Sequence, residues 1–374
     1  MNRKFRHIAL LALAAVMTVG CGSASEEDID LPVPPQPGQE TPIAFSGSLS
    51  EEGAVTRTEP AGLETVLPNG DKKFVVWAFK NDASNGRQTV MNGYTVNWVD
   101  NTAYTTTSNT HDWEYVNQGT DQTIKYWDWG ASAYRFFGYT GNVNVTPPGS
   151  TASDPLVLSF TAAAAATNPQ SEPVTLPDGP FYSKMWYSTG NPGVYPDRLY
   201  GKPVLLEFLK PYVKVRFLFK QSAPDDVYFY KTDIIFAPTD TEKKIATSGT
   251  FTVIYPLTGT GSVDTEESWG VTASSIIDAL IQADDATSGL PVLDSGKWWI
   301  VLPAHNQGSY TLSLKVNGEA KTVVVPAEFM EWKPGYEYTY IFKIIDEGGV
   351  VLDNVKVGFS PWTVVEKSKE IYNW

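Results

Sequence analysis

Residues 211–219 read PYVKVRFLF, and this stretch shows what kind of fold to expect. Apolar residues occupy the odd positions from 213 to 219, and Lys214 and Arg216 lie between them. Successive side chains of a strand point to opposite faces, so this alternation predicts an antiparallel strand with one buried and one half-exposed face.

Similar runs, bounded by Gly and Pro, recur along the chain and predict roughly fifteen short strands. Residues 74–79 (FVVWAF) are apolar on both faces, so we expect a central strand there. Asn317-Gly318 separates two alternating runs and predicts a two-residue hairpin. Residues 274–283 are expected to form one short helix, because four apolar residues share one helical face: Ile276, Ile277, Leu280 and Ile281. The pattern predicts an all-β protein of two antiparallel β-sandwich domains with one short helix.

The N-terminus has the features of a secretory signal. Arg3, Lys4 and Arg6 precede an apolar run over residues 8–19, which is too short for a permanent membrane span. The single cysteine, Cys21, follows Gly20 in a segment similar to a lipobox, which predicts lipidation there. We therefore expect a lipoprotein signal peptide (1–20), an acidic and Pro-rich linker (21–41), and sandwich domains over 42–200 and 201–374.

Composition limits the classes of function. The formal charge of −14 gives a surface that repels phosphate backbones, so nucleic acid is not an expected partner. Apart from His7 in the signal, the histidines are His111 and His305, both in turn-like sequence. No nucleophile elbow, phosphate loop or zinc-protease motif occurs, so we expect no enzymatic activity, no cofactor and no metal site.

Aromatic residues offer a second kind of site. Four tryptophans could form a stacking platform for a glycan or receptor: Trp98, Trp113, Trp127 and Trp129. Alternating aromatic residues also fill sandwich cores, and the sequence leaves both interpretations open. In the adjacent pairs Phe136-Phe137 and Trp298-Trp299, a strand directs one ring to each face, so one ring of each pair could be exposed.

Several features follow one another along the chain: Cys21, the alternating residues Ile43, Phe45 and Leu49, Thr56-Arg57-Thr58, residues 75–79, residues 125–127 followed by 134–139, residues 204–219, residues 336–342, and Pro361-Trp362. In this order they resemble the fimbrillin-like lipoproteins of Bacteroidetes, which build or decorate type V pili. The resemblance implies two transthyretin-like sandwiches and export as a lipid-anchored, surface-exposed protein of the cell outer membrane.

The resemblance also implies a mode of assembly. Pilin members of the family are cut by a trypsin-like protease after an arginine behind the first strand, and Arg57 is the matching position. Loss of the strand that carries Ile43, Phe45 and Leu49 would open an apolar groove for a strand of a neighbouring subunit. The most plausible donor, residues 363–374, is charged in its middle, which leaves room for a tip or accessory role.

We therefore expect a surface-anchored structural or tip/accessory subunit of a type V pilus, assembled by strand exchange, with a role in adhesion. Its partners would be other pilin subunits, or surface ligands of the host or of other bacteria. The alternative is a non-polymerising cell-surface lipoprotein that binds glycans through exposed aromatic residues.

Overall fold

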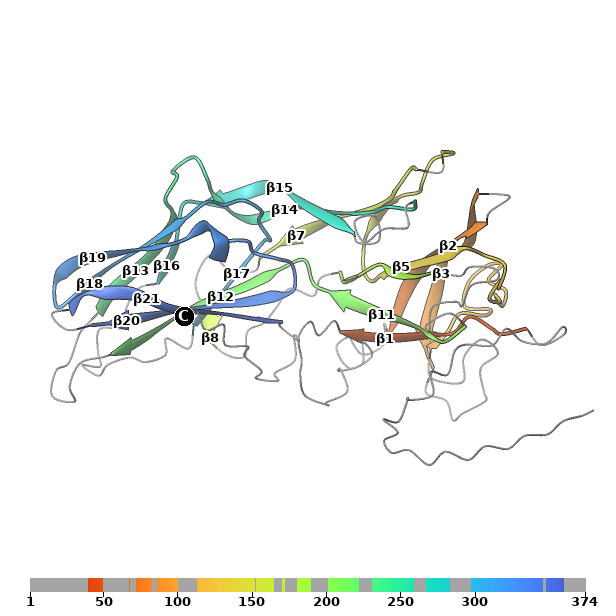
Figure 1. Cartoon of the computed structure of the whole chain (residues 1–374), viewed down its shortest axis with the longest axis horizontal. Helices are drawn as coiled ribbons and strands as arrows, with labels where there is room; N and C mark the ends of the chain where they lie inside the picture. The colour runs from red at the N-terminus through yellow and green to blue at the C-terminus, as the bar shows by residue number, and fades with distance from the viewer. Residues whose placement is uncertain are drawn as a thin grey trace, which may run out of the picture.

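The structure is a computed structural model that describes residues 40–49, 67, 72–82, 86–99, 113–151, 153–164, 170–171, 180–189, 201–221, 231–258, 267–282, 297–345 and 348–359. These residues form an elongated arrangement of four β-sheets (Figure 1). The all-β class and the sandwich-like arrangement expected from the sequence are confirmed. Among the described residues, no helix has the length and apolar character needed to cross a membrane.

The largest sheet, called here the eight-stranded sheet, lies to the right in Figure 1. Its strands, in spatial order, are β1 (Phe45–Leu49), β11 (Val204–Leu209), β9 (Tyr182–Ser183), β5 (Ala133–Tyr139), β2 (Lys73–Asp82), β3 (Gly86–Trp98) and β4 (Trp113–Glu114), with β10 (Trp186–Thr189) paired to β5. The strand β2 is central, as its apolar sequence predicted.

The C-terminal sandwich lies to the left in Figure 1 and consists of two sheets. The five-stranded sheet has the order β21 (Val350–Phe359), β20 (Tyr336–Ile344), β12 (Val213–Gln221), β17 (Lys297–Val301) and β8 (Gln170–Ser171). The β13 sheet has the order β16 (Leu280–Gln282), β13 (Lys231–Pro238), β18 (Tyr310–Val316) and β19 (Glu319–Val325). The 3-10 turn η2 (Ala327–Phe329) lies between β19 and β20 in this sandwich.

The fourth sheet, called here the β14 sheet, lies above and between these two parts in Figure 1. Its order is β15 (Ser268–Ile277), β14 (Ile245–Tyr255), β7 (Leu156–Ala163) and β6 (Asn144–Thr146). Strand pairing therefore crosses residue 200, where we expected a domain boundary: β7 pairs with β14, and β11 joins the eight-stranded sheet. The division into domains remains a prediction.

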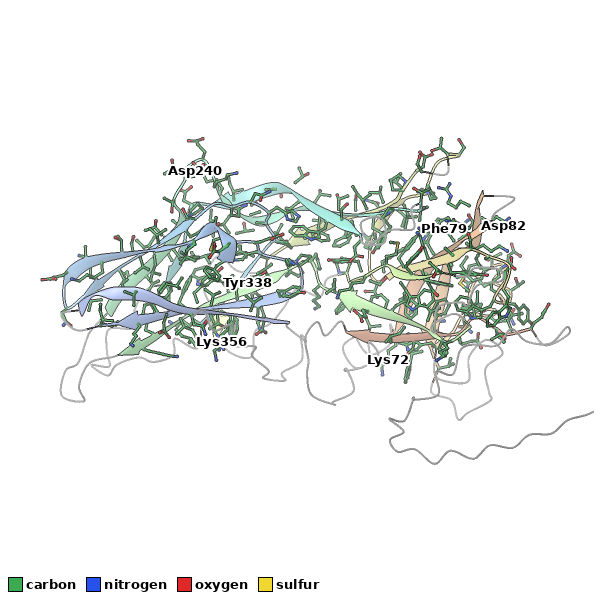
Figure 2. All side chains as sticks on the ribbon, viewed as in Figure 1. Lys72, Phe79, Asp82, Asp240, Tyr338 and Lys356 are labelled. Atoms are coloured by element: carbon green, nitrogen blue, oxygen red, sulfur yellow. The ribbon has the colours of Figure 1, made fainter. Side chains whose placement is uncertain are left out.

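The side chains of the described residues form three apolar cores in this arrangement (Figure 2). The C-terminal core lies between the five-stranded and β13 sheets and contains Phe217, Phe236 and Tyr340. The β1 core covers one face of the eight-stranded sheet, and the bridge core fills the space between its other face and the β14 sheet. Phe136 lies in the β1 core and Phe137 in the bridge core, so neither ring is exposed.

The prediction of a helix over residues 274–283 is wrong. Residues 268–277 form β15 and residues 280–282 form β16. Ile276 and Ile281 are 56% and 54% exposed, while Leu280 is buried. The main chain of β15 pairs along β14, a partner distant in sequence, and that pairing overrides the local helical spacing.

Two strand pairs depart from the expected antiparallel pattern. The strand β1 runs parallel to β11, and β12 runs parallel to β20. The polar side of β12 is also more covered than predicted, because Lys214 and Arg216 pack over the buried ring of Trp298 at 4.4 and 4.3 Å from its centroid. The hairpin at Asn317-Gly318 is confirmed: both residues have positive φ (51° and 87°), and Val316 pairs with Glu319.

Candidate interaction site: the first strand and its groove

The first described strand, β1, is the end strand of the eight-stranded sheet. It pairs in parallel with β11, in a register that runs from Phe45–Val204 to Leu49–Phe208. The Val204 N–H donates to the Ala44 carbonyl at 2.8 Å. Within the described residues, β11 is the only strand hydrogen-bonded to β1. An end strand with one neighbour can leave its sheet by breaking one hydrogen-bond ladder.

The main chain just before β1, at Thr41 and Ile43, is hydrogen-bonded to residues 125–127. The Ile43 N–H donates to the Lys125 carbonyl at 2.8 Å, and the Trp127 N–H donates to the Thr41 carbonyl at 3.0 Å. Residues 125–127 therefore pair with the segment before β1, through an isolated bridge between Pro42 and Tyr126. Residues 41–49 form one continuous insert between the 125–127 segment and β11.

The side chains of this insert complete the β1 core. Ile43 is fully buried and Phe45 is 1% exposed. The Phe45 ring meets three aromatic rings edge-on, with centroid distances of 6.0 Å to Phe74, 5.7 Å to Tyr115 and 5.9 Å to Phe136. Burial of each large apolar side chain stabilises the insert by about 1.5–3 kcal/mol, and good aromatic pairs add to this.

Tyr115 links the insert to the β1 core through hydrogen bonds of its hydroxyl. Its hydroxyl donates to the Ile43 carbonyl at 3.0 Å and accepts the Lys125 N–H at 3.0 Å. Burial raises the pKa of Tyr115, and this effect is larger than that of its hydrogen bonds, so the hydroxyl keeps its proton and remains a donor at neutral pH. Tyr115 was not singled out from the sequence, since nothing in its local pattern indicates this role.

Removal of residues 41–49 would leave an apolar groove. Its floor would be formed by rings that Phe45 now covers, namely Phe74 and Phe136, with Phe208 next to Phe74 at 5.3 Å. One wall would be the main chain of β11, whose pairing groups toward β1 would lose their partners. Such a groove accepts an extended segment with alternating apolar residues.

Several residues named from the sequence fall outside the described part of the chain. These are Cys21, the lipidation position; Arg57, the cleavage position; and residues 363–374, the candidate donor segment. Leu49 ends β1, but its side chain is outside the description. Lipidation and cleavage therefore remain predictions.

The tryptophans proposed as glycan contacts lie mainly in the β1 core. Trp113 and Trp127 are 3% and 4% exposed, so their ring faces are not open to a ligand. This part of the expectation is corrected: both rings pack against other aromatic rings, Trp113 against Phe74 and Trp127 against Tyr134. Trp98 and Trp129 are half-buried against the same core, and Trp98 also lines a surface pocket with Lys72 and Lys73. The four rings do not form an open platform. In the Trp298-Trp299 pair, too, both rings are buried.

Comparisons with known proteins give matches among solved structures. The chain is similar to a "putative cell adhesion protein" from Bacteroides uniformis (16% identity, TM-score 0.39, 88% of this chain and 100% of that one). It is also similar to one of the same name from Bacteroides ovatus (15%, 0.40, 88% and 100%). A third match is a fimbrial protein from Bacteroides vulgatus (12%, 0.39, 85% and 99%). These structural neighbours carry adhesion or fimbrial names. No family model matches the sequence, and no curated protein matches it.

Proposed function

We propose that the protein is a surface-anchored structural or tip/accessory subunit of a type V pilus, assembled by strand exchange, with a role in adhesion. The observation that supports this most is the insert of residues 41–49. It occupies the end of a sheet, pairs with a strand about 160 residues later in sequence, and buries Ile43 and Phe45 completely or nearly so.

The proposal includes a maturation pathway. Cys21 would carry the lipid that anchors the precursor to the outer membrane, and cleavage after Arg57 would separate the insert covalently from the rest of the chain. The insert would then be held by non-covalent contacts alone and could be replaced by a strand of another subunit. No catalytic role is part of this proposal. Glycan binding through the platform of four tryptophans loses support, since Trp113 and Trp127 are buried.

Limited trypsin digestion of the folded, lipid-free protein tests this function, with intact mass and size-exclusion chromatography as readouts. We expect a cut after Arg57, release of the N-terminal fragment, and larger species at rising concentration. The matched control is Arg57→Gln, which should keep the fragment attached and remain monomeric under the same digestion. A wild-type protein that is cut after Arg57 but stays monomeric, or that is never cut there, would contradict assembly by this route.

A further inference from the structure

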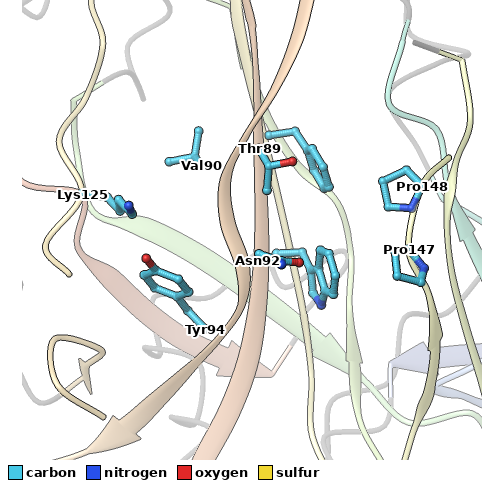
Figure 3. Close-up of a pocket in the computed structure, with 9 residues that line it drawn as sticks. Thr89, Val90, Asn92, Tyr94, Lys125, Pro147 and Pro148 are labelled. Atoms are coloured by element: carbon cyan, nitrogen blue, oxygen red, sulfur yellow. The ribbon is translucent and has the colours of Figure 1, made fainter. Parts of the chain in front are cut away.

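A groove at the β3 edge of the eight-stranded sheet is not used by the proposed function. It lies along β3, has a volume of about 460 Å³, and extends to the segment after β6 (Figure 3). Figure 3 shows Tyr94 and Lys125 to one side of β3, Pro147 and Pro148 to the other, and Thr89 and Asn92 on the strand between them.

The floor of the groove is shaped by an irregularity in β3. The pairing of β2 with β3 shifts register between Val76 and Ala78, which leaves Asn92 and Gly93 opposite Trp77. Gly93 has φ of +65°, a conformation that a side chain would strain, and a Cβ there would meet the Trp77 indole at 3.6 Å. A bulge of this kind re-aims side chains, and Asn92 is exposed at the groove.

Both walls are held in place by hydrogen bonds. On one side, Arg87 donates to the Gly149 carbonyl at 2.7 Å and to the Asp154 carbonyl at 3.0 Å, which fixes the segment that follows Pro147 and Pro148. On the other side, Ile43 and Tyr115 hold the main chain of Lys125. The Lys125 ammonium lies 5.6 Å from the centroid of the Tyr94 ring, which packs against Tyr115.

The charge of the groove contrasts with that of the chain. Among the described residues that line it, Lys125 is the only charged one, whereas the whole chain has a formal charge of −14. No carboxylate in the described residues is within ion-pair distance of Lys125. Beside this cation, the lining offers the half-buried ring of Tyr94 and two neutral hydrogen-bonding side chains, Thr89 and Asn92, and its other members are apolar or aromatic.

We propose that this groove binds a saccharide unit that carries a carboxylate, such as a uronic or sialic acid. The carboxylate would pair with the Lys125 ammonium, a charge-assisted contact that is stronger than a neutral hydrogen bond. The C–H face of the sugar ring would lie on Tyr94, and its hydroxyls would bond to Thr89 and Asn92. Sites with aromatic surface and a few convergent polar groups are typical of ligand pockets.

This site is separate from the groove that β1 fills, and its test uses the uncut protein. The probes are 3′-sialyllactose and a glucuronate-terminated tetrasaccharide, each compared with its carboxyl-reduced form, in titrations followed by NMR. We expect at least one acidic probe to bind, its reduced form to bind about tenfold more weakly, and binding to weaken as salt is raised. Lys125→Met should weaken the acidic probe about tenfold as well, because it keeps the length of the side chain and removes its charge.

Matched variants separate recognition from folding. Lys321→Met removes a lysine of the β13 sheet that pairs with Glu319, and it should leave binding unchanged. Asn92→Ala changes an exposed side chain and should weaken binding while the fold is kept. The proposal is overturned if neither acidic probe binds, if the reduced forms bind equally well, or if Lys125→Met and Asn92→Ala both bind like the wild type.

Discussion

Two strand pairs in the described part of the chain are parallel, and they differ in whether one of the two strands ends its sheet. In the C-terminal sandwich, β20 runs parallel to β12 but also pairs with β21, so it has a neighbour on each side. In the eight-stranded sheet, β1 runs parallel to β11 and ends the sheet. The nine residues of β20 are held by two ladders, and the five residues of β1 by one.

This difference indicates which strand the fold can release. Withdrawal of β20 would break two ladders and remove Tyr338, Tyr340 and Phe342 from the C-terminal core. Withdrawal of β1 would break one ladder and remove Phe45 from a core that β2, β5 and β11 still line. Local opening follows the number of buried contacts and hydrogen bonds that must be broken, so β1 should open at lower free energy than β20.

The largest effect is expected in the C-terminal core. Phe236 is fully buried and packs against Phe217, Tyr310 and Tyr340, with ring centroids 4.9, 5.0 and 5.2 Å away. Phe236→Ala should lower the free energy of unfolding by about 3–5 kcal/mol, because it leaves a cavity. Urea denaturation followed by tryptophan fluorescence measures this. The control is the adjacent Ile235→Ala, at a side chain 40% exposed, which should cost less than about 1 kcal/mol. Equal losses in both variants would contradict the assigned core.

A smaller and more local effect is expected in β1. Phe45→Ala should speed amide exchange in residues 41–49 and 204–208 by about a hundredfold, which corresponds to roughly 2–3 kcal/mol of local stability. Amides of β20 should keep their protection, since that strand lies in the other sandwich. Hydrogen-exchange mass spectrometry distinguishes the two regions, and Ser46→Ala, at an exposed position of the same strand, is the control. Uniform loss of protection in both regions would show that β1 is not a separate unit.

The pH dependence of stability offers a third comparison. Burial raises the pKa of Tyr115 above its ordinary value of about 10, so the folded state keeps a proton that the unfolded state loses as pH rises. Its contribution is fully present below pH 10 and is lost progressively above it, by up to about 1.4 kcal/mol per pH unit. Urea denaturation between pH 8 and 11 should therefore show that the free energy of unfolding falls less steeply with pH in Tyr115→Phe than in the wild type. Identical slopes would contradict the assigned environment.

At neutral pH the same substitution should have the smallest effect. Tyr115→Phe removes the hydroxyl that lies between Ile43 and Lys125 and should cost about 1 kcal/mol, measured by amide exchange at these two residues. The control is Tyr94→Phe, whose hydroxyl makes one long contact with the described residues, of 3.5 Å to the Asp121 carbonyl. Exchange at Ile43 should respond to the first variant and not to the second. A response at Ile43 to Tyr94→Phe and not to Tyr115→Phe would contradict the role of the Tyr115 hydroxyl in holding the insert.

The sequence predicted elements whose cause is local. Alternation identified β12, the apolar run identified β2 as central, and Asn317-Gly318 identified the hairpin between β18 and β19. Pairings between distant segments were not predictable, because periodicity carries no information about which strands become neighbours. The β1–β11 pair and the pairing of β15 with β14 are of this kind, and the second one made the helix prediction fail. The prediction of a tryptophan platform failed for a related reason. A ring on an alternating strand is exposed only if nothing covers that face of the strand, and the segment that covers it comes from elsewhere in the chain.

The central claim is that the groove under β1 accepts another strand, and peptide complementation tests it most directly. The protein is cut with trypsin after Arg57, the N-terminal fragment is removed, and a synthetic peptide of residues 40–50 is titrated in, with a Phe45→Asp peptide as control. We predict that the native peptide binds one-to-one and suppresses the larger species, whereas the control peptide does neither, because a carboxylate cannot enter the apolar space between Phe74 and Phe136. The claim would be contradicted if the cut, folded protein does not bind the native peptide, or if it binds both peptides equally.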